Sequence, residues 1–394
     1  MKSINLDYGA ATPVAHRVLE AMMPYFSEYY GNPSSGHDLG EKPGQALAEA
    51  REKVAELIGS SPGEVVFTSC ASESNNTALK GIAAANKKNG RHIITSSIEH
   101  FSVLNPLRTL EKEGYRVTYL PVDGTGLIDS QQLREAISSD TVLISIMTAN
   151  PEIGTIQPVD ELAEIARESG VVFHTDATAA AGFIPLDVKS LKVDLLSLAG
   201  NQFYGPKGSG ALFVRKGIRY LPLLEGGVQE GGRRAGGENV PAIVGLGEAA
   251  LLARETLEQR AASLREIRDG LKKQLFSRIT HLHLNGHPER RLPHNLHFSV
   301  EFVEGEALLM HLNKAGIYVS SGSTCTSQAL KSSHVLSAIG LSPELAQGSL
   351  LFTLGEENSI DDIPYVVERL DETTGNLRYM SPLYQKYLKE GSGN

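Results

Sequence analysis

Few cysteines, no tryptophan and no long apolar run characterise this 394-residue sequence. Its two cysteines, Cys70 and Cys325, are too few for a disulfide framework, and no Cys-x-x-Cys pair suggests a structural zinc site. No uncharged apolar run reaches the roughly 18–20 residues that span a bilayer, and the first residues lack the apolar segment of a signal peptide. These absences predict a cytoplasmic protein without a membrane anchor.

Basic residues are outnumbered as well. The chain has 37 Lys and Arg residues against 46 Asp and Glu residues, a net charge of -9, and no basic cluster stands out. Proteins that neutralise nucleic-acid phosphates need the opposite balance, so a nucleic-acid partner is disfavoured. The chain is longer than the ~250–300 residues at which a single core stops growing, so two domains are expected.

Short β-branched runs alternate with helical periodicity through the first half of the chain. This alternation predicts a largely parallel sheet covered by helices on both faces. Strands are predicted at 64–67, 92–95, 117–120, 142–146, 171–174 and 195–197, and helices at 45–57, 104–112, 131–137 and 159–168.

The remaining sequence has a different pattern of predicted helices and strands. A long helical region over 242–279 follows a Gly-rich stretch and precedes a mixture of short strand and helix patterns. We therefore expect a large domain over 15–255 and a smaller α+β domain built from 1–14 and 256–394.

Residues just after the predicted strands are the first candidates for chemistry, because ligands in open α/β sheets bind outside the carboxyl ends of the strands. Ser72 lies in a small-residue turn that leads into a helix, an arrangement that binds phosphate, although an ordinary helix cap fits it equally well. His100 and Asp176 each follow a strand. An imidazole can stack on a pyridinium ring and a carboxylate can bind its ring nitrogen. Their joint position indicates such a site.

Six ordered segments carry a family resemblance, at 6–13, 31–37, 67–74, 152–158, 204–208 and 321–327. Together they resemble the cysteine desulfurases of the NifS/IscS type, which have the class V aminotransferase fold. The resemblance implies an α/β, type I fold for pyridoxal phosphate (PLP), with a mostly parallel sheet sandwiched by helices and a smaller α+β C-terminal domain. It also implies a homodimer and a mobile loop near 320–332, whose cysteine, Cys325, receives sulfur as a persulfide.

Several positions depart from the family pattern. Gln202 stands where the resemblance places the lysine that bonds to PLP, and a carboxamide can neither form that bond nor act as the base. Leu351 stands at the arginine that clamps the substrate carboxylate, which removes an ion-pair donor. The other substituted family positions are Pro151, Ala179, Ala199, Asn201 and Gly237.

These substitutions lead to the expectation that no cofactor is tightly bound. Each lost hydrogen bond to a phosphate or carboxylate is worth roughly 1.5–3 kcal/mol. A vestigial or weak PLP pocket would then be formed by the residues that remain, Ser72, His100 and Asp176 with Gln202. No metal site is expected, apart from a role for Cys325 as an iron–sulfur ligand, and Cys70 is expected to be a small buried residue.

The leading hypothesis is a desulfurase-like protein of sulfur or iron–sulfur metabolism that has lost the standard chemistry. It would act through Cys325, as a persulfide acceptor or a cluster ligand, together with a scaffold or sulfur-acceptor protein. One alternative is an active PLP-dependent cysteine desulfurase or transferase that holds PLP non-covalently. Another is a non-catalytic regulatory or heterodimer partner of a desulfurase.

Overall fold

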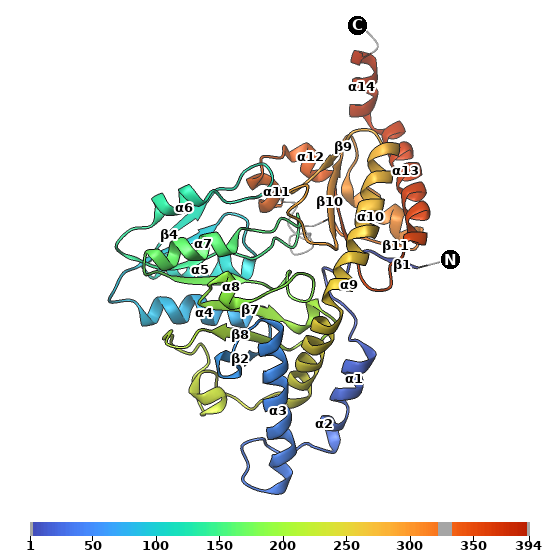
Figure 1. The fold of residues 1–394 in the computed structure, drawn as a ribbon. Coiled ribbons are helices and arrows are strands. Elements are labelled where there is room, and N and C mark those ends of the chain that lie inside the picture. Colours follow the sequence, from blue (N-terminus) through green and yellow to red (C-terminus); the bar gives the residue numbers. More distant parts are fainter. Residues whose placement is uncertain (1–2, 322–332, 392–394) are drawn as a thin grey trace.

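The computed structural model describes residues 3–321 and 333–391 (Figure 1). Most of the predicted cysteine loop, Cys325 included, lies outside the described residues. No helix in the described ranges is both long enough and apolar enough to cross a membrane.

A seven-stranded sheet forms the centre of the large domain, with the strand order β2-β8-β7-β6-β5-β3-β4. The strands from β7 to β4 are parallel, whereas β8 is antiparallel to both of its neighbours. Every predicted strand of this sheet is confirmed within two residues, but β8 was not predicted. The bounds are β2 (Val65–Thr68), β3 (His92–Ser96), β4 (Arg116–Leu120), β5 (Thr141–Ser145), β6 (Val172–Asp176), β7 (Leu195–Ala199) and β8 (Gly210–Val214).

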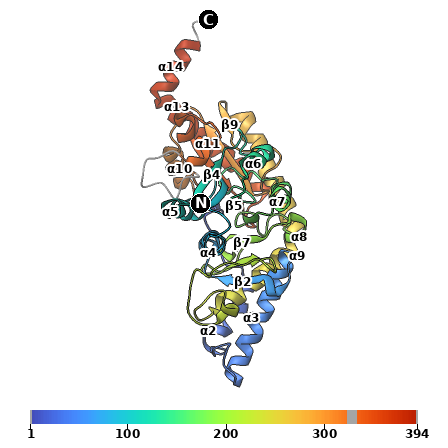
Figure 2. The same ribbon diagram turned by 90° about the vertical axis from the view of Figure 1, so that its left-hand side faces the viewer.

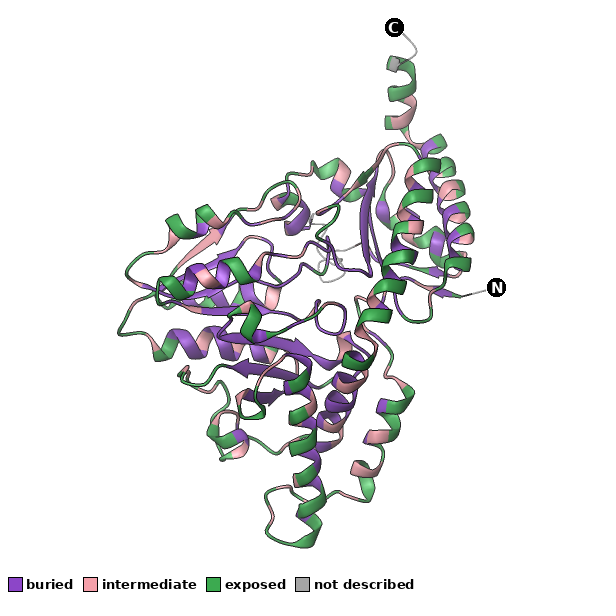
Figure 3. Ribbon diagram, viewed as in Figure 1, coloured by how far each residue is buried: buried purple, intermediate pink, exposed green. Residues whose placement is uncertain are grey.

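The central strands are buried on both faces, as their continuous apolar runs predict (Figure 3). Successive side chains of a strand point to opposite faces. Accordingly Ile144 and Leu196 belong to the hydrophobic cluster on one face, whereas Leu143 and Leu195 belong to the cluster on the other.

Helices cover both faces of this sheet. The helices α4 and α5 pack on one face and α3 and α7 on the other. The predicted helices correspond to the second half of α3 and to α5, α6 and α7. The bounds are α1 (His16–Met22), α2 (Pro24–Ser27), α3 (Asp38–Leu57), α4 (Ala71–Ala85), α5 (Phe101–Lys112), α6 (Ser130–Ala136), α7 (Val159–Glu168) and α8 (Val188–Leu191).

The C-terminal part forms a second, smaller layer of sheet and helices. Its antiparallel sheet has the order β12-β10-β9, and β1 pairs in parallel with β11. Both ribbon views show α14 projecting from the body (Figures 1 and 2). The bounds are β1 (Ile4–Asn5), β9 (Leu282–Leu284), β10 (Asn295–Val300), β11 (Ile317–Tyr318), β12 (Ser349–Thr353), α10 (Gly305–Lys314), α11 (His334–Ala338), α12 (Pro343–Gln347), α13 (Ile363–Met380) and α14 (Pro382–Gly391).

The 39-residue helix α9 (Val240–Arg278) runs through both parts (Figure 1). Residues in its first half, such as Leu246, belong to a core of the large domain, whereas Leu264 and Leu271 belong to the core of the small domain. The helix therefore fixes the two cores relative to each other. The predicted boundary at residue 255 falls inside this helix and stays a prediction.

Candidate active site

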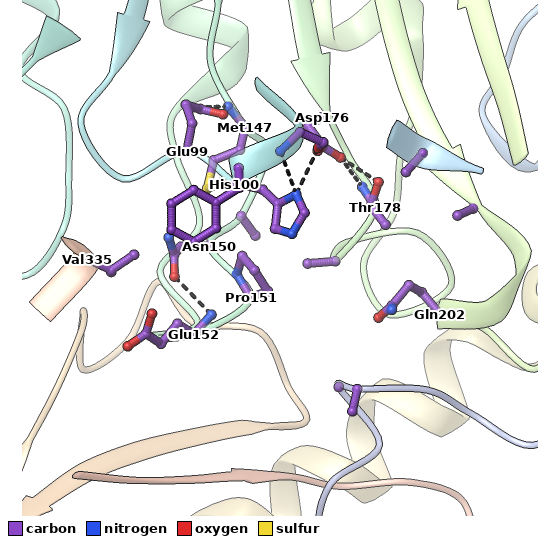
Figure 4. Close-up of a pocket in the computed structure, with 18 of the residues that line it drawn as sticks. Glu99, His100, Met147, Asn150, Pro151, Glu152, Asp176, Thr178, Gln202 and Val335 are labelled. Atoms are coloured by element: carbon purple, nitrogen blue, oxygen red, sulfur yellow. Dashed lines mark hydrogen bonds between the residues drawn. The ribbon is translucent and has the colours of Figure 1, made fainter. Parts of the chain in front are cut away.

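A cavity of about 380 Å³ lies where the carboxyl ends of the parallel strands face the small domain (Figure 4). Most of the predicted site residues line it. Gly237 does not, and it lies on an exposed part of the loop before α9, while Cys325 is outside the described residues. The predicted residues that line the cavity are Ser72, His100, Pro151, Asp176, Ala179, Ala199, Asn201, Gln202 and Leu351.

Asp176 is the last residue of β6, and its side chain is held in place by neighbours. It is 7% exposed. Its Oδ2 accepts a hydrogen bond from Asn75 Nδ2 at 2.7 Å, and its Oδ1 accepts from the backbone N–H and the hydroxyl of Thr178. These bonds fix the direction of the carboxylate at the edge of the cavity.

His100 caps the start of α5, and Ser102 orients its ring. The Nδ1 atom accepts from the backbone N–H of Ser102 at 3.1 Å, which places the ring proton on Nε2. Asn75 Nδ2 also donates to Ser102 Oγ at 2.8 Å. The fully buried Asn75 therefore links Asp176 to the His100 side of the site. Sequence reasoning missed this residue.

The helix α4 begins at the same cavity. Cys70, Ala71 and Ser72 line the cavity at this end. The first backbone N–H groups of a helix have no partner within it and favour an anion. The prediction that Cys70 is buried is wrong, because the residue caps this helix at the cavity edge and is half-buried.

We call Asn75, His100, Asp176 and Thr178 the ring side of the cavity. Gln202 belongs to the short 3₁₀ turn Gly200–Gln202 and is half-buried. In Figure 4 it lies on the side of the cavity where Asp176 and Thr178 also lie.

Two buried glutamates, Glu99 and Glu152, define what we call the carboxyl side. Glu99 Oε1 accepts from Ser96 Oγ at 2.6 Å and from the backbone N–H of Met147 at 2.9 Å. Glu152 Oε2 accepts from Ser333 Oγ at 2.8 Å. Burial raises the pKa of each carboxyl to about 8, so both are largely protonated at neutral pH. Sequence reasoning gave neither residue a role.

Three apolar side chains also line the carboxyl side, those of Phe101, Val335 and Leu351. The imidazole of His334 lies beside them, with its Nε2 atom 3.0 Å from the Glu99 backbone oxygen. Leu351 is fixed by its backbone, which exchanges hydrogen bonds with Ser320 at 2.7 and 3.2 Å. Among the described lining residues there is no lysine and no arginine.

Comparison with known proteins places the chain in a family. The sequence model of the family Aminotransferase class-V matches residues 4–363. The chain belongs to the class-V aminotransferases. Cysteine desulfurase IscS of Methanosarcina thermophila is 51% identical over 385 residues, which cover 98% of this chain and 95% of that protein. Cysteine desulfurase IscS of Dictyoglomus turgidum is 48% identical over 386 residues, 98% of each chain.

Two solved structures are similar over most of the chain. A NifS-like protein superimposes with a TM-score of 0.89 at 38% identity, covering 94% of this chain and 99% of its own. The structure described as SspA in complex with cysteine gives a TM-score of 0.80 at 38% identity, covering 90% and 99%. The predicted α/β fold class, of the PLP type I, is confirmed.

The expectation that no cofactor is tightly bound is wrong. Relatives about half identical over nearly the whole chain are named cysteine desulfurases, which are PLP-dependent, so PLP is the cofactor to expect. The expectation counted the substituted family positions one by one. It did not consider that the ring-side residues still form one connected hydrogen-bond network. The comparisons likewise do not support the hypothesis that desulfurase chemistry is lost, and they favour the active-enzyme alternative.

The described residues fit PLP in part. Asp176 offers a buried carboxylate to the ring nitrogen, His100 offers an imidazole, and the start of α4 with Ser72 offers hydrogen bonds to a phosphate. Gln202 has no amine for a covalent bond, and no other described lining residue has one. The site therefore fits a PLP molecule that is held by non-covalent contacts.

Proposed function

We propose that this protein is a PLP-dependent cysteine desulfurase that holds PLP non-covalently, with Gln202 in place of the family's lysine. The similarity to cysteine desulfurases along nearly the whole chain supports the activity. The single observation that carries the cofactor assignment is the network in which Asn75 Nδ2 contacts both Asp176 and Ser102. A solved relative in complex with cysteine supports the choice of substrate.

The residues of the ring side have distinct roles in this proposal. When bound, PLP would supply an electron sink for the substrate carbon. Asp176 would keep a proton on the ring nitrogen by presenting its carboxylate to that N–H. His100 would cover the ring face, since Ser102 holds its imidazole in one orientation. Ser72 and the first turn of α4 would bind the phosphate.

Cys325 is the proposed sulfur acceptor. In the net exchange the substrate C–S bond breaks and an S–S bond forms on the Cys325 sulfur. The cysteine substrate leaves as alanine, so its carbon is reduced while the two sulfurs are oxidised. The persulfide would then pass to a sulfur-acceptor or iron–sulfur scaffold protein. Cys325→Ser should keep PLP binding and lose the protein-bound persulfide.

A homodimer is part of the proposal. Large apolar side chains are exposed on α2 and on the 221–228 segment, among them Phe26 at 60% and Val228 at 86%. Exposed apolar surface of this kind marks an interface, and a symmetric dimer would bury it. Gly237, outside the cavity of its own chain, would then lie toward the partner subunit. Sedimentation should give a dimer for the native chain and a monomer for Phe26→Glu.

Substitution at residue 202 tests the proposed function. The native protein should bind PLP that gel filtration slowly removes, and it should convert cysteine to alanine. Gln202→Lys should trap PLP covalently, as shown by borohydride reduction and mass spectrometry. Lys207→Gln, in the exposed turn that follows, is the matched control and should behave as the native chain. Native protein that neither retains PLP nor forms alanine would overturn the proposal.

A further inference from the structure

The short helix α11 of the small domain packs against the large domain beside the cavity. Its N-cap residue, Ser333, is the first described residue after the part of the chain that contains Cys325. Because Ser333 is joined covalently to that part of the chain, any contact that fixes Ser333 also fixes the point where the Cys325 segment ends.

The hydroxyl of Ser333 makes hydrogen bonds in two directions. It donates to Glu152 Oε2 of the large domain at 2.8 Å. Its oxygen also accepts from the backbone N–H groups of Val335 and Leu336, at 3.1 and 3.3 Å. Ser333 and Glu152 are 6% and 8% exposed, so water competes little for this contact. One hydroxyl therefore caps α11 and connects the helix to the large domain.

The position of Glu152 is fixed by its own backbone. Asn150 Oδ1 accepts from the backbone N–H groups of Glu152 and Ile153, at 2.9 and 3.0 Å (Figure 4). Asn295 Nδ2 donates to the Glu152 backbone oxygen at 3.1 Å. The acceptor for Ser333 is therefore held in place before α11 contacts it.

The remaining contacts of α11 with the large domain are one further hydrogen bond and apolar packing. His334 Nε2 lies 3.0 Å from the Glu99 backbone oxygen, and it is the donor because a carbonyl oxygen only accepts. Apolar packing is non-directional, so it holds the helix close without fixing its orientation, whereas hydrogen bonds are directional. The cluster contains Ile98, Ile153, Val335, Leu336, Ile339 and Ala346.

We propose that Glu152 is a positioning residue: through Ser333 it fixes the start of α11, and thereby the end of the chain segment that brings Cys325 to the substrate. The part played by Cys325 rests on the proposed function, whereas the contact between Glu152 and α11 does not. Glu152 acts through the oxygen that accepts the Ser333 hydroxyl. An uncharged side chain with an acceptor oxygen in the same place should therefore do as well.

Hydrogen exchange of the backbone amides at 333–341 tests the contact without cofactor or substrate. Glu152→Leu removes the acceptor, so α11 opens more easily and its amides should exchange about tenfold faster, as expected for one lost hydrogen bond. Glu152→Gln keeps an acceptor oxygen and should exchange as the native chain does. Ser342→Ala removes the cap of the next helix, α12, and is the matched control that should leave α11 unchanged. Native exchange in α7 would show that the fold as a whole is intact.

A double-mutant cycle separates the contact from the helix cap. Ser333→Ala loses both, so its α11 amides should exchange faster than those of Glu152→Leu. Once Ser333 is replaced, Glu152 has no hydroxyl to accept from. Adding Glu152→Leu to Ser333→Ala should therefore change the exchange rate little further.

The rate of persulfide formation on Cys325 tests the positioning role. With PLP bound and cysteine at saturation, this rate should fall about tenfold in Glu152→Leu, because a displaced sulfur loses its orientation toward the substrate. The PLP affinity and the KM for cysteine should stay native. Glu152→Gln should restore the native rate. Rapid quenching followed by mass spectrometry measures the persulfide.

Each result decides one part of the inference. Native exchange of α11 in Glu152→Leu overturns the contact, and additive effects in the cycle do the same. Faster exchange with an unchanged rate of persulfide formation overturns the positioning role. If the native protein forms no alanine from cysteine, the proposed activity fails, and the exchange rates still decide whether Glu152 holds α11.

Discussion

The two sides of the cavity differ in how their polar side chains are held. On the ring side, Asp176 accepts hydrogen bonds from Asn75 and from Thr178 on both of its oxygens. On the carboxyl side, Glu99 and Glu152 each keep one buried oxygen without a partner among the described residues. The ring-side carboxylate is bonded through both of its oxygens, although Asn75 Oδ1 is also buried without a partner there, whereas each carboxyl-side glutamate is bonded through one oxygen only.

This difference decides which side of the cavity can bind a ligand in a fixed geometry. A network of mutually bonded groups holds its geometry and loses little entropy when a ligand binds. A buried oxygen without a partner instead carries a free-energy penalty. The ring side therefore suits a resident cofactor, whereas the carboxyl side depends on two buried glutamates that stay protonated.

The largest effect is expected at Asp176. Asp176→Asn keeps the shape of the side chain but removes the charge that would face the ring nitrogen in the proposed complex, so PLP affinity should fall about 100-fold. Equilibrium dialysis with PLP measures this directly. Asp7→Asn removes a carboxylate from the same cavity outside the ring side and should leave PLP affinity nearly unchanged. Equal losses in both variants would show that net charge alone matters, and the comparison of the two sides would fail.

The sheet was largely predictable from the sequence. Buried parallel strands such as β5 and β6 are continuous apolar runs, which local patterns reveal. The strand β8 was missed because it is an antiparallel strand that follows directly on a turn, so no helix separates it from the strand before.

The site residues were predictable from the sequence only where the topology of the sheet determines their position. The strand-end rule found His100 and Asp176, since carboxyl ends of parallel strands meet at one edge. Asn75 lies inside a helix, and nothing in the sequence distinguishes it from any other polar residue of a helix. Only tertiary packing brings it to Asp176. Glu152 looks like a solvent-exposed loop residue in the sequence, and its burial depends on the small domain, through Ser333.

A smaller effect is expected at Asn75. Asn75→Leu keeps the branched shape of the side chain but leaves Asp176 Oδ2 and Ser102 Oγ without this donor, so PLP affinity should fall about tenfold. The free energy of unfolding should also fall, by about 1–3 kcal/mol. Fluorescence titration with PLP and urea unfolding give the two values.

The neighbouring Asn76 provides the control. It lies on the same helix and donates to the Ser72 backbone oxygen at 2.9 Å. Asn76→Leu should change PLP affinity less than Asn75→Leu does. If Asn75→Leu binds PLP as the native chain does, the ring side is not a connected network.

The smallest effect concerns pH and the carboxyl side. Burial raises the pKa of Glu152 from 4.5 to about 8, opposed only by the Ser333 hydrogen bond. The folded protein therefore binds this proton more tightly than the unfolded chain does. By linkage, the resulting stability is fully present below the unfolded pKa of 4.5 and is lost as the pH rises to about 8.

Glu152→Gln removes this titration. Between about pH 5 and pH 8 the free energy of unfolding of the variant should fall less than that of the native protein, by a difference on the order of 2 kcal/mol. Urea unfolding at several pH values measures it. Glu161→Gln, at an exposed position of α7, should follow the native curve. If the curve for Glu152→Gln also parallels the native one, Glu152 is solvated in solution. The carboxyl side would then have no buried, protonated Glu152, and its contrast with the ring side would disappear.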